Sequence, residues 1–213
     1  MDCRHGDSHG IDCGKNVDME DLLKCNIEKT LGEKVPDAMI AKFMELSFEK
    51  SYFKKQFLAE TGENCKYQYF ILEGSCYSYY INEKGDKNAI QFAIENYWIT
   101  DATGYFTNRP AIFNIETLEP TRALLLNREN FDILCKAFPL YDRFFRILLQ
   151  NTLAHLHYRI AKTNSEDAKH RYKEFSQLYP HFIQRIPQYL IASYLGIAPP
   201  SLSRIRKEIA LEV

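Results

Sequence analysis

Three prolines and one glycine divide residues 186–209 into two short helices joined by a tight turn. Pro187 suits the first turn of a helix, where its missing N–H costs nothing. Gly196 can adopt the positive φ that follows a helix end. Pro199 and Pro200 stop any helix before them and preset φ for a new one. The segment therefore predicts a helix-turn-helix.

The second of these helices has one apolar and one polar face. Leu202, Ile205 and Ile209 follow the i, i+3, i+7 spacing of a buried helix face. The opposite face carries Ser201, Ser203, Arg204, Arg206 and Lys207. A short helix that is basic on one side can enter the major groove of DNA and read base edges. Helix–glycine–helix corners also occur in proteins that never touch nucleic acid, so this pattern alone leaves both interpretations open.

Charge is unevenly distributed along the chain, although the formal net charge is only −1. Residues 151–213 hold 9 Lys and Arg against 5 Asp and Glu, whereas residues 1–150 hold 18 against 23. A basic C-terminal part behind an acidic N-terminal part favours a nucleic-acid partner at one end of the molecule.

Between residues 51 and 127 the sequence pattern changes to short aromatic and β-branched runs. The runs cover residues 52–58, 67–72, 76–81, 88–94 and 113–118. Turn signals separate them at residues 61–64, 73–74 and 82–86. Short strands at this spacing predict an antiparallel sandwich or jelly roll, with hairpin turns at the last two signals.

Helical patterns lie on both sides of this strand-rich region. Residues 18–48 predict packing helices, and a long helix is predicted to begin at Pro139 and to run to about Ile160. Its apolar residues include Leu140, Phe144, Ile147, Leu148, Leu149, Leu153 and Leu156. This surface is broader than one stripe, so the helix is predicted to face both its own sheet and the same helix of a partner. Thr163 with Glu166 forms a capping-box pattern that predicts the start of the next helix.

The first 18 residues are rich in Gly, Asp and His and are predicted to be a disordered extension. They contain Cys3, His5, His9 and Cys13, which are residue types that zinc favours, but their spacing matches no tight metal knuckle. No metal site is therefore predicted. No apolar run is long enough to span a membrane and the N-terminus lacks a signal-peptide core, so the chain is expected to be cytoplasmic, with its cysteines as thiols.

A strand-rich region, a long helix and a helix-turn-helix, in this order, resemble the Crp/Fnr family of bacterial transcription regulators over roughly residues 20–209. The resemblance is strongest at residues 171–175, 179–180, 184–188 and 191–209, which look like members from Bacteroidetes. It implies an α+β fold: an N-terminal antiparallel β-roll (a cyclic-nucleotide-binding-like jelly roll) with flanking helices, a long central dimerisation helix and a C-terminal helix-turn-helix domain.

The same resemblance implies a division of the chain and a set of partners. After the extension at 1–18, residues 19–138 would form the sensor domain, 139–163 the dimerisation helix and 164–213 the DNA-binding domain. The implied partners are a second copy of the chain, a palindromic operator in double-stranded DNA, and RNA polymerase. No membrane partner is expected.

In that family the arginine that matches Arg204 contacts base edges, commonly guanine. Ser201 and Ser203 match positions near the backbone or the bases, while Arg206 and Lys207 are expected nearer phosphate. Two departures concern this region. Pro200 cannot read a base edge by hydrogen bonding, and the chain stops four residues after Ile209, so most of the wing hairpin is expected to be missing.

A third departure concerns the ligand site. Cyclic-nucleotide binders of the family carry Gly-Glu for the ribose and an arginine for the cyclic phosphate. Here Thr100 and Asp101 stand in place of Gly-Glu, and the arginine position is apolar. Tight cAMP binding is therefore not expected, because a buried phosphate needs a matched cation or donors. Trp98, Asp101 and Arg109 are the candidates for contacting another small-molecule effector, if there is one; no cofactor is predicted.

The leading hypothesis from the sequence is a dimeric transcription regulator with a β-roll sensor. The alternative is a small-molecule-binding module that acts through protein partners without binding DNA. An enzyme is not expected, because no nucleophile–base pair, phosphate loop or paired-carboxylate motif is present.

Overall fold

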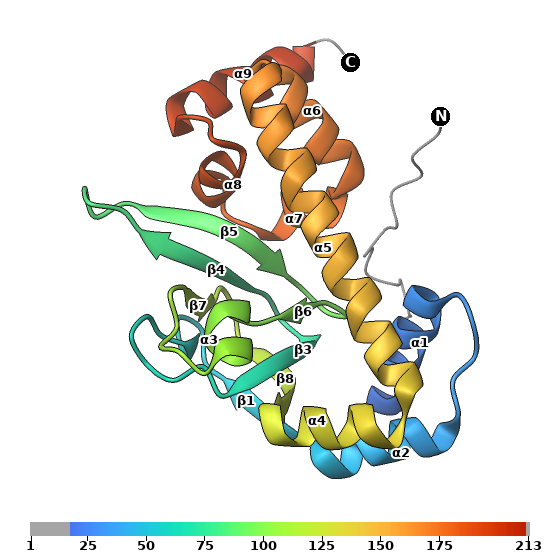
Figure 1. Ribbon diagram of the computed structural model, residues 1–213. Coiled ribbons are helices and arrows are strands. Elements are labelled where there is room, and N and C mark those ends of the chain that lie inside the picture. The colour runs from blue at the N-terminus through green and yellow to red at the C-terminus, as the bar shows by residue number, and fades with distance from the viewer. Residues whose placement is uncertain (1–17, 212–213) are drawn as a thin grey trace.

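Two four-stranded antiparallel sheets lie face to face in the N-terminal part of the structure, a computed structural model that describes residues 18–211 (Figure 1). The first sheet has the order β1 (Phe48–Tyr52), β8 (Thr121–Asn127), β3 (Tyr67–Glu73) and β6 (Trp98–Ile99). The second has the order β2 (Phe57–Ala59), β7 (Asn114–Thr117), β4 (Cys76–Ile81) and β5 (Lys87–Ala93). The predicted jelly roll is confirmed.

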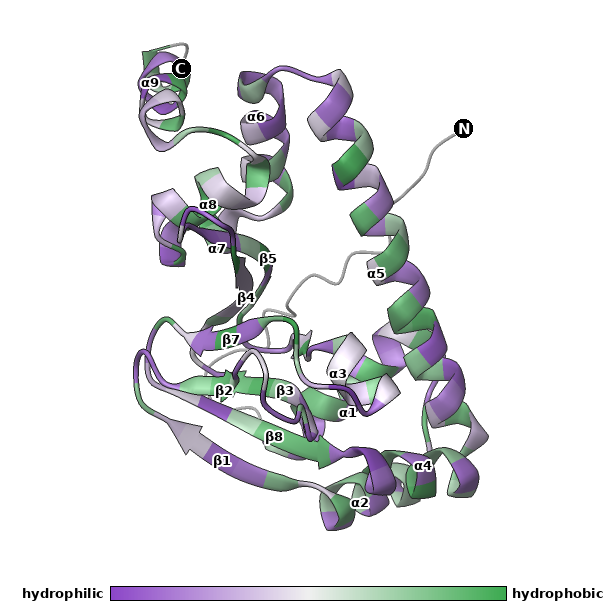
Figure 2. Ribbon diagram, turned by 60° about the vertical axis from the view of Figure 1, so that its left-hand side comes forward, coloured by the Kyte–Doolittle hydropathy of each residue, from purple (hydrophilic) through white to green (hydrophobic). Residues whose placement is uncertain are grey.

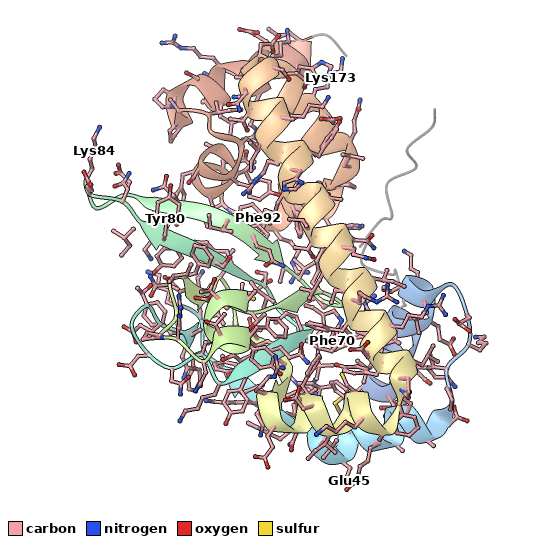
Figure 3. The ribbon with its side chains drawn as sticks, in the orientation of Figure 1. Glu45, Phe70, Tyr80, Lys84, Phe92 and Lys173 are labelled. Atoms are coloured by element: carbon pink, nitrogen blue, oxygen red, sulfur yellow. The ribbon has the colours of Figure 1, made fainter. Side chains whose placement is uncertain are left out.

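Alternation along the strands gives each sheet two different faces. On β3, Tyr69 and Ile71 point between the sheets, where they pack with Leu125 of β8 and Ile115 of β7. Phe70, between them, points the other way, into a core that the flanking helices complete (Figure 3). Both faces of the first sheet are therefore buried, which explains why its central strands are apolar almost throughout.

The flanking helices come from three parts of the chain. They are α1 (Met19–Leu31), α2 (Asp37–Leu46), α4 (Arg128–Ala137) and the beginning of α5 (Pro139–Ser165). Gly32 ends α1 in the left-handed region at φ 73°, and Pro36 caps α2. Tyr141 and Phe144, near the start of α5, are fully buried against this core.

The C-terminal part consists of α6 (Ala168–Leu178), α7 (Pro180–Arg185), α8 (Gln188–Leu195) and α9 (Pro199–Leu211). The predicted capping box at Thr163 is wrong. Thr163 stays inside α5, where its hydroxyl donates to the carbonyl of Arg159, and α5 continues to Ser165. The cap of α6 is Asp167, whose carboxylate accepts the N–H of His170 at 2.8 Å.

Other element boundaries also differ from those predicted. Residues 52–58 form two strands because the chain turns between Tyr52 and Phe57, with Lys55 at φ 65°. The helix α3 (Ala102–Thr107) and the strands β6 and β8 were not predicted as elements. No helix within residues 18–211 is long and apolar enough to cross a membrane.

The C-terminal helices pack on the second sheet and so make one continuous body with the β-roll. Phe92 of β5 lies beneath them (Figure 3), with its ring centroid 5.8 Å from that of Phe182 and 5.1 Å from that of Tyr194. Along α5, hydrophobic and hydrophilic residues alternate as the helix runs from the β-roll to α6 (Figure 2).

Candidate nucleic-acid interface

The helix pair α8–α9 is joined by a turn that satisfies its own backbone. Gly196 ends α8 at φ 64° and ψ 38°, and the N–H of Ile197 bonds to the carbonyl of Ala192 at 2.9 Å. This is the hydrogen bond of a Schellman motif, which requires the left-handed conformation that glycine adopts without strain. The turn predicted from Gly196 is confirmed.

The two faces of α9 differ sharply in exposure. Leu202 is 1% exposed and Ile205 is 9% exposed. Burial of two such side chains contributes about 1.5–3 kcal/mol each to holding α9 in place. All five residues predicted to contact DNA are exposed on the other face: Ser201, Ser203, Arg204, Arg206 and Lys207.

This exposed face carries three cations. No carboxylate within residues 18–211 forms an ion pair with Arg204, Arg206 or Lys207. At the flank of the helix, Glu208 pairs instead with Lys169 of α6, at 3.5 Å. A basic helix face with such exposed cations attracts phosphate groups, so the geometry is compatible with DNA binding.

The helix pair is docked on the second sheet by polar contacts as well as by aromatic rings. The hydroxyl of Ser193 accepts the N–H of Ala89 at 3.0 Å and donates to the carbonyl of Lys87 at 3.1 Å. Arg185 pairs with both Glu95 and Glu119. Burial is the largest influence on the pKa of Glu95 and raises it. The hydrogen bonds from Arg185 and from the backbone N–H groups of Glu95 and Gly74, together with the charge of Arg185, outweigh burial and hold that pKa below its usual value.

The three residues predicted to contact an effector have different surroundings. Trp98 is buried in the core, where its Nε1–H donates to Asn26 of α1 at 2.9 Å. Asp101 is 0% exposed, and its carboxylate accepts the backbone N–H groups of Gly104, Ile112 and Phe113. Arg109 is exposed. The prediction that these residues contact an effector stays a prediction.

The carboxylate of Asp101 also explains the shape of the segment around α3. It caps α3 through Gly104 and holds the returning chain through Ile112. A Cβ at Gly104 would lie 2.7 Å from the Cβ of Cys65, so this segment packs closely against the loop before β3. Trp98 and Asp101 therefore position the segment that connects the two sheets.

A metal site was not predicted, and within residues 18–211 no group of three or more His, Cys, Asp or Glu side chains could hold a metal ion. The cysteines in this range are free thiols: Cys25, Cys65, Cys76 and Cys135. The predicted extension at 1–18 lies, except for its last residue, outside the described residues, as do Cys3, His5, His9 and Cys13.

The strand order, the segment around α3 and the helix that follows β8 together define the domain. Residues 49–138 match the family described as "Cyclic nucleotide-binding domain". This part of the chain, which holds most of the β-roll, is therefore similar to cyclic nucleotide-binding domains. The match ends just before α5, so the C-terminal helices lie outside it. No curated protein sequence matches the chain.

The similarity to solved structures extends beyond residues 49–138. FixK2 from Bradyrhizobium japonicum is 16% identical, with a TM-score of 0.66 over 78% of this chain and 85% of its own. The catabolite activator protein of Thermus thermophilus is 15% identical, with a TM-score of 0.56 over 86% and 87%. The c-di-GMP-responsive global regulator CLP of Xanthomonas campestris is 12% identical, with a TM-score of 0.64 over 83% and 93%.

These three proteins are Crp/Fnr family regulators, so the resemblance predicted from the sequence is confirmed at the level of the fold. The chain shares with them both the β-roll and the helices that follow it. The similarity to members from Bacteroidetes stays a prediction.

Sequence reasoning missed the residues by which α5, α7 and α8 are joined to the β-roll. Ser193, Arg185 and Arg159 make these contacts, and none belongs to a recognisable motif. One signal was available: β5 carries Phe92 on the opposite face from the core between the sheets. An aromatic residue on the outer face of a strand predicts a further layer of structure above it.

Proposed function

We propose that the protein is a transcription regulator of Crp/Fnr type that binds double-stranded DNA as a homodimer. The observation that carries this proposal is the exposed basic face of α9, which forms no ion pair with a carboxylate in residues 18–211 and is held in place by buried Leu202 and Ile205. In a helix-turn-helix the second helix enters the major groove, which assigns Arg204 to base edges and Arg206 and Lys207 to phosphate.

The second half of α5 supports the proposed homodimer. Leu149, Leu153 and Ile160 are 41%, 54% and 57% exposed, and Leu156 between them is half-buried. Their spacing of four, three and four residues is that of a coiled-coil seam. A second copy of α5 is the partner that would cover this stripe. A two-fold axis along α5 would present two copies of α9 to successive major grooves of a palindromic operator.

The effector, if there is one, is proposed not to be cAMP. Thr100 donates its hydroxyl to the carbonyl of Tyr67 at 3.0 Å, and Asp101 is fully engaged with backbone N–H groups. Within α3 no side chain is cationic, so this helix offers no partner for a cyclic phosphate.

A second candidate function is a small-molecule-binding module that acts through protein partners without binding DNA. It is favoured by the extensive contact between the helix pair and the second sheet. Through this contact a conformational change in the β-roll could reach the helix pair without DNA. The protein is proposed to act in the cytoplasm, where its DNA would be, and not as an enzyme.

Binding to duplex DNA at several salt concentrations separates the two candidates. Sites selected from genomic DNA are bound to the full chain and followed by fluorescence anisotropy. A regulator should lose affinity steeply as salt rises, because each neutralised phosphate releases counterions with a log–log slope of about −0.9. Affinity that is undetectable at low salt would contradict the proposal and favour the protein-partner alternative.

A further inference from the structure

A cavity of about 50 Å³ lies where α5, α6 and α8 meet. These helices converge above the second sheet (Figure 1). Among the described residues, those that line the cavity come from these three helices and from Tyr179, and none comes from α9 or from a strand. The cavity is thus separate from the cyclic nucleotide-binding domain and from the proposed DNA-binding face.

The lining of this cavity is positively charged. Arg159, Lys162 and Arg171 contribute three cations, against the single carboxylate of Glu174. That carboxylate is already engaged: it accepts the hydroxyl of Tyr158 at 2.6 Å and lies 3.6 Å from Lys162. Lys162 also pairs with Glu166, outside the lining. Both nearby carboxylates, those of Glu166 and Glu174, therefore pair with Lys162.

The two arginines are held by neutral groups. Arg159 donates Nη1–H to the carbonyl of Ile90 at 2.9 Å, and its Cζ lies 4.3 Å from the ring centroid of Tyr194. Arg171 donates Nε–H to the carbonyl of Leu195 at 3.2 Å and another N–H to the carbonyl of Glu166. No carboxylate in the described part of the chain pairs with either guanidinium.

Two guanidinium groups without counter-ions, both half-buried, create a site for an anion. Carbonyl oxygens orient a guanidinium without cancelling its charge, and its remaining N–H groups can bind two oxygens of a carboxylate or phosphate. Phe175, Leu178 and Leu195 give the cavity apolar walls, which weaken the competition from water.

The size of the cavity limits the ligand. One water needs about 10–15 Å³ measured in this way, so 50 Å³ holds a group of a few heavy atoms. Pockets for drug-sized ligands reach about 300–1,000 Å³, and a whole nucleotide would not fit. The volume and the charge together describe a compact oxyanion.

We propose that this cavity binds a compact oxyanion, a phosphate or carboxylate group that is either free or carried by a small metabolite. The anion would join Arg159 on α5 to Arg171 on α6 and so fix the helix pair relative to the long helix. The proposal that an anion binds depends only on the cavity and its two arginines. The consequence for DNA affinity rests on the function proposed above.

Inorganic phosphate and phenyl phosphate are the probes. Each is titrated into the full chain by calorimetry and by thermal unfolding, with chloride at the same ionic strength as the reference. Phosphate should bind and raise the melting temperature beyond the chloride reference. Tighter binding of phenyl phosphate would identify a carried group with an aromatic body, whereas phosphate binding alone would identify a free ion.

Three variants locate the site. Arg159→Gln and Arg171→Gln should each weaken binding of the probe at least tenfold, while Arg146→Gln, at an exposed arginine on the same helix, should leave it unchanged. Because Arg171 also supports the turn after α8, Arg171→Lys is included. It keeps the charge and should retain more affinity than Arg171→Gln, with each melting shift measured from that variant's own baseline.

The proposal is overturned if neither probe binds more strongly than chloride, or if the Arg146 variant loses as much affinity as the cavity variants. DNA affinity is measured separately, with and without phosphate at constant ionic strength. Phosphate binding without a change in DNA affinity would overturn the coupling and leave the site in place. Loss of DNA binding under every condition would contradict the proposed function and leave the anion titration unaffected.

Discussion

Ser193 of α8 occupies the open edge of the second sheet by accepting the N–H of Ala89 at 3.0 Å. The same hydroxyl donates to the carbonyl of Lys87 at 3.1 Å, so one side chain satisfies two of the backbone groups that an added strand would use. β5 is the last strand of its sheet, and an exposed edge of this kind invites pairing with other chains. The helix pair therefore protects this edge of the β-roll and is fixed to it by the same contact.

Replacing Ser193 with alanine should destabilise the protein by about 1–3 kcal/mol, since it leaves the part-buried N–H of Ala89 without its partner, whereas the exposed carbonyl of Lys87 can bind water. Chemical denaturation measures the change. Ser165→Ala is the matched control, because the hydroxyl of Ser165 donates only to the carbonyl of Ala161 within an exposed turn of α5. Equal stability of the two variants would mean that the contact with β5 contributes nothing.

The pair between Arg185 and Glu95 should make the docking of α7 sensitive to acid. The pKa of Glu95 in the folded protein lies below its usual value of 4.5, so folding favours the carboxylate form. This contribution is fully present above the unfolded pKa and is lost as the pH falls through the folded pKa. Unfolding free energy measured between pH 6 and pH 3 should fall less steeply in Glu95→Gln than in the wild type. Identical profiles would argue against the pair.

The exposed stripe on α5 predicts a specific way to separate the proposed dimer. Leu153→Glu places a charge in the centre of the stripe and should shift sedimentation from dimer to monomer at micromolar concentration. Ile133→Glu is the control, because Ile133 is a similarly exposed apolar residue on α4. If both variants sediment like the wild type, the dimer does not form through this stripe.

Asp101 and Arg109 should differ in their effect on stability in the absence of any effector. Asp101→Ala removes the acceptor of three backbone N–H groups and should cost about 3–5 kcal/mol, because hydrogen bonds to a charged group contribute about 1.5–3 kcal/mol each and do not add fully. Arg109→Ala, at an exposed position, should change stability by less than about 0.5 kcal/mol. A small effect at Asp101 would show that these hydrogen bonds contribute little and would contradict the structural role assigned to its carboxylate.

Much of this fold could be predicted from local patterns. The strands β3, β4 and β5 lie within a residue or two of the predicted runs, because alternation and turn residues are properties of neighbouring positions. The turn at Gly196 followed from its conformational freedom. The predictions failed where a contact between residues far apart in the sequence determines the local structure. Thr163 remains helical because α5 extends past it, and residues 52–58 divide because Thr117 of β7 binds the backbone of the turn between them.

The candidate nucleic-acid interface also has a part that could be predicted from local patterns and a part that could not. The exposed residues of α9 follow from helical periodicity and were predicted individually. The contacts that position α9 were not, because Ser193, Arg185 and Arg159 find their partners only after the β-roll has folded. Asp101 matches a ligand-site position in the sequence, but in the structure its carboxylate accepts hydrogen bonds from the backbone of the protein itself.

The central claim is that α9 reads DNA through Arg204, and one comparison tests it most directly. Operator affinity of Arg204→Ala is measured by fluorescence anisotropy beside Arg146→Ala, which removes an exposed arginine from α5. Arg204→Ala should weaken binding to the selected operator by about 1–3 kcal/mol and relax the preference at one base position, with the melting temperature unchanged. Unchanged affinity and unchanged base preference in Arg204→Ala would contradict the account.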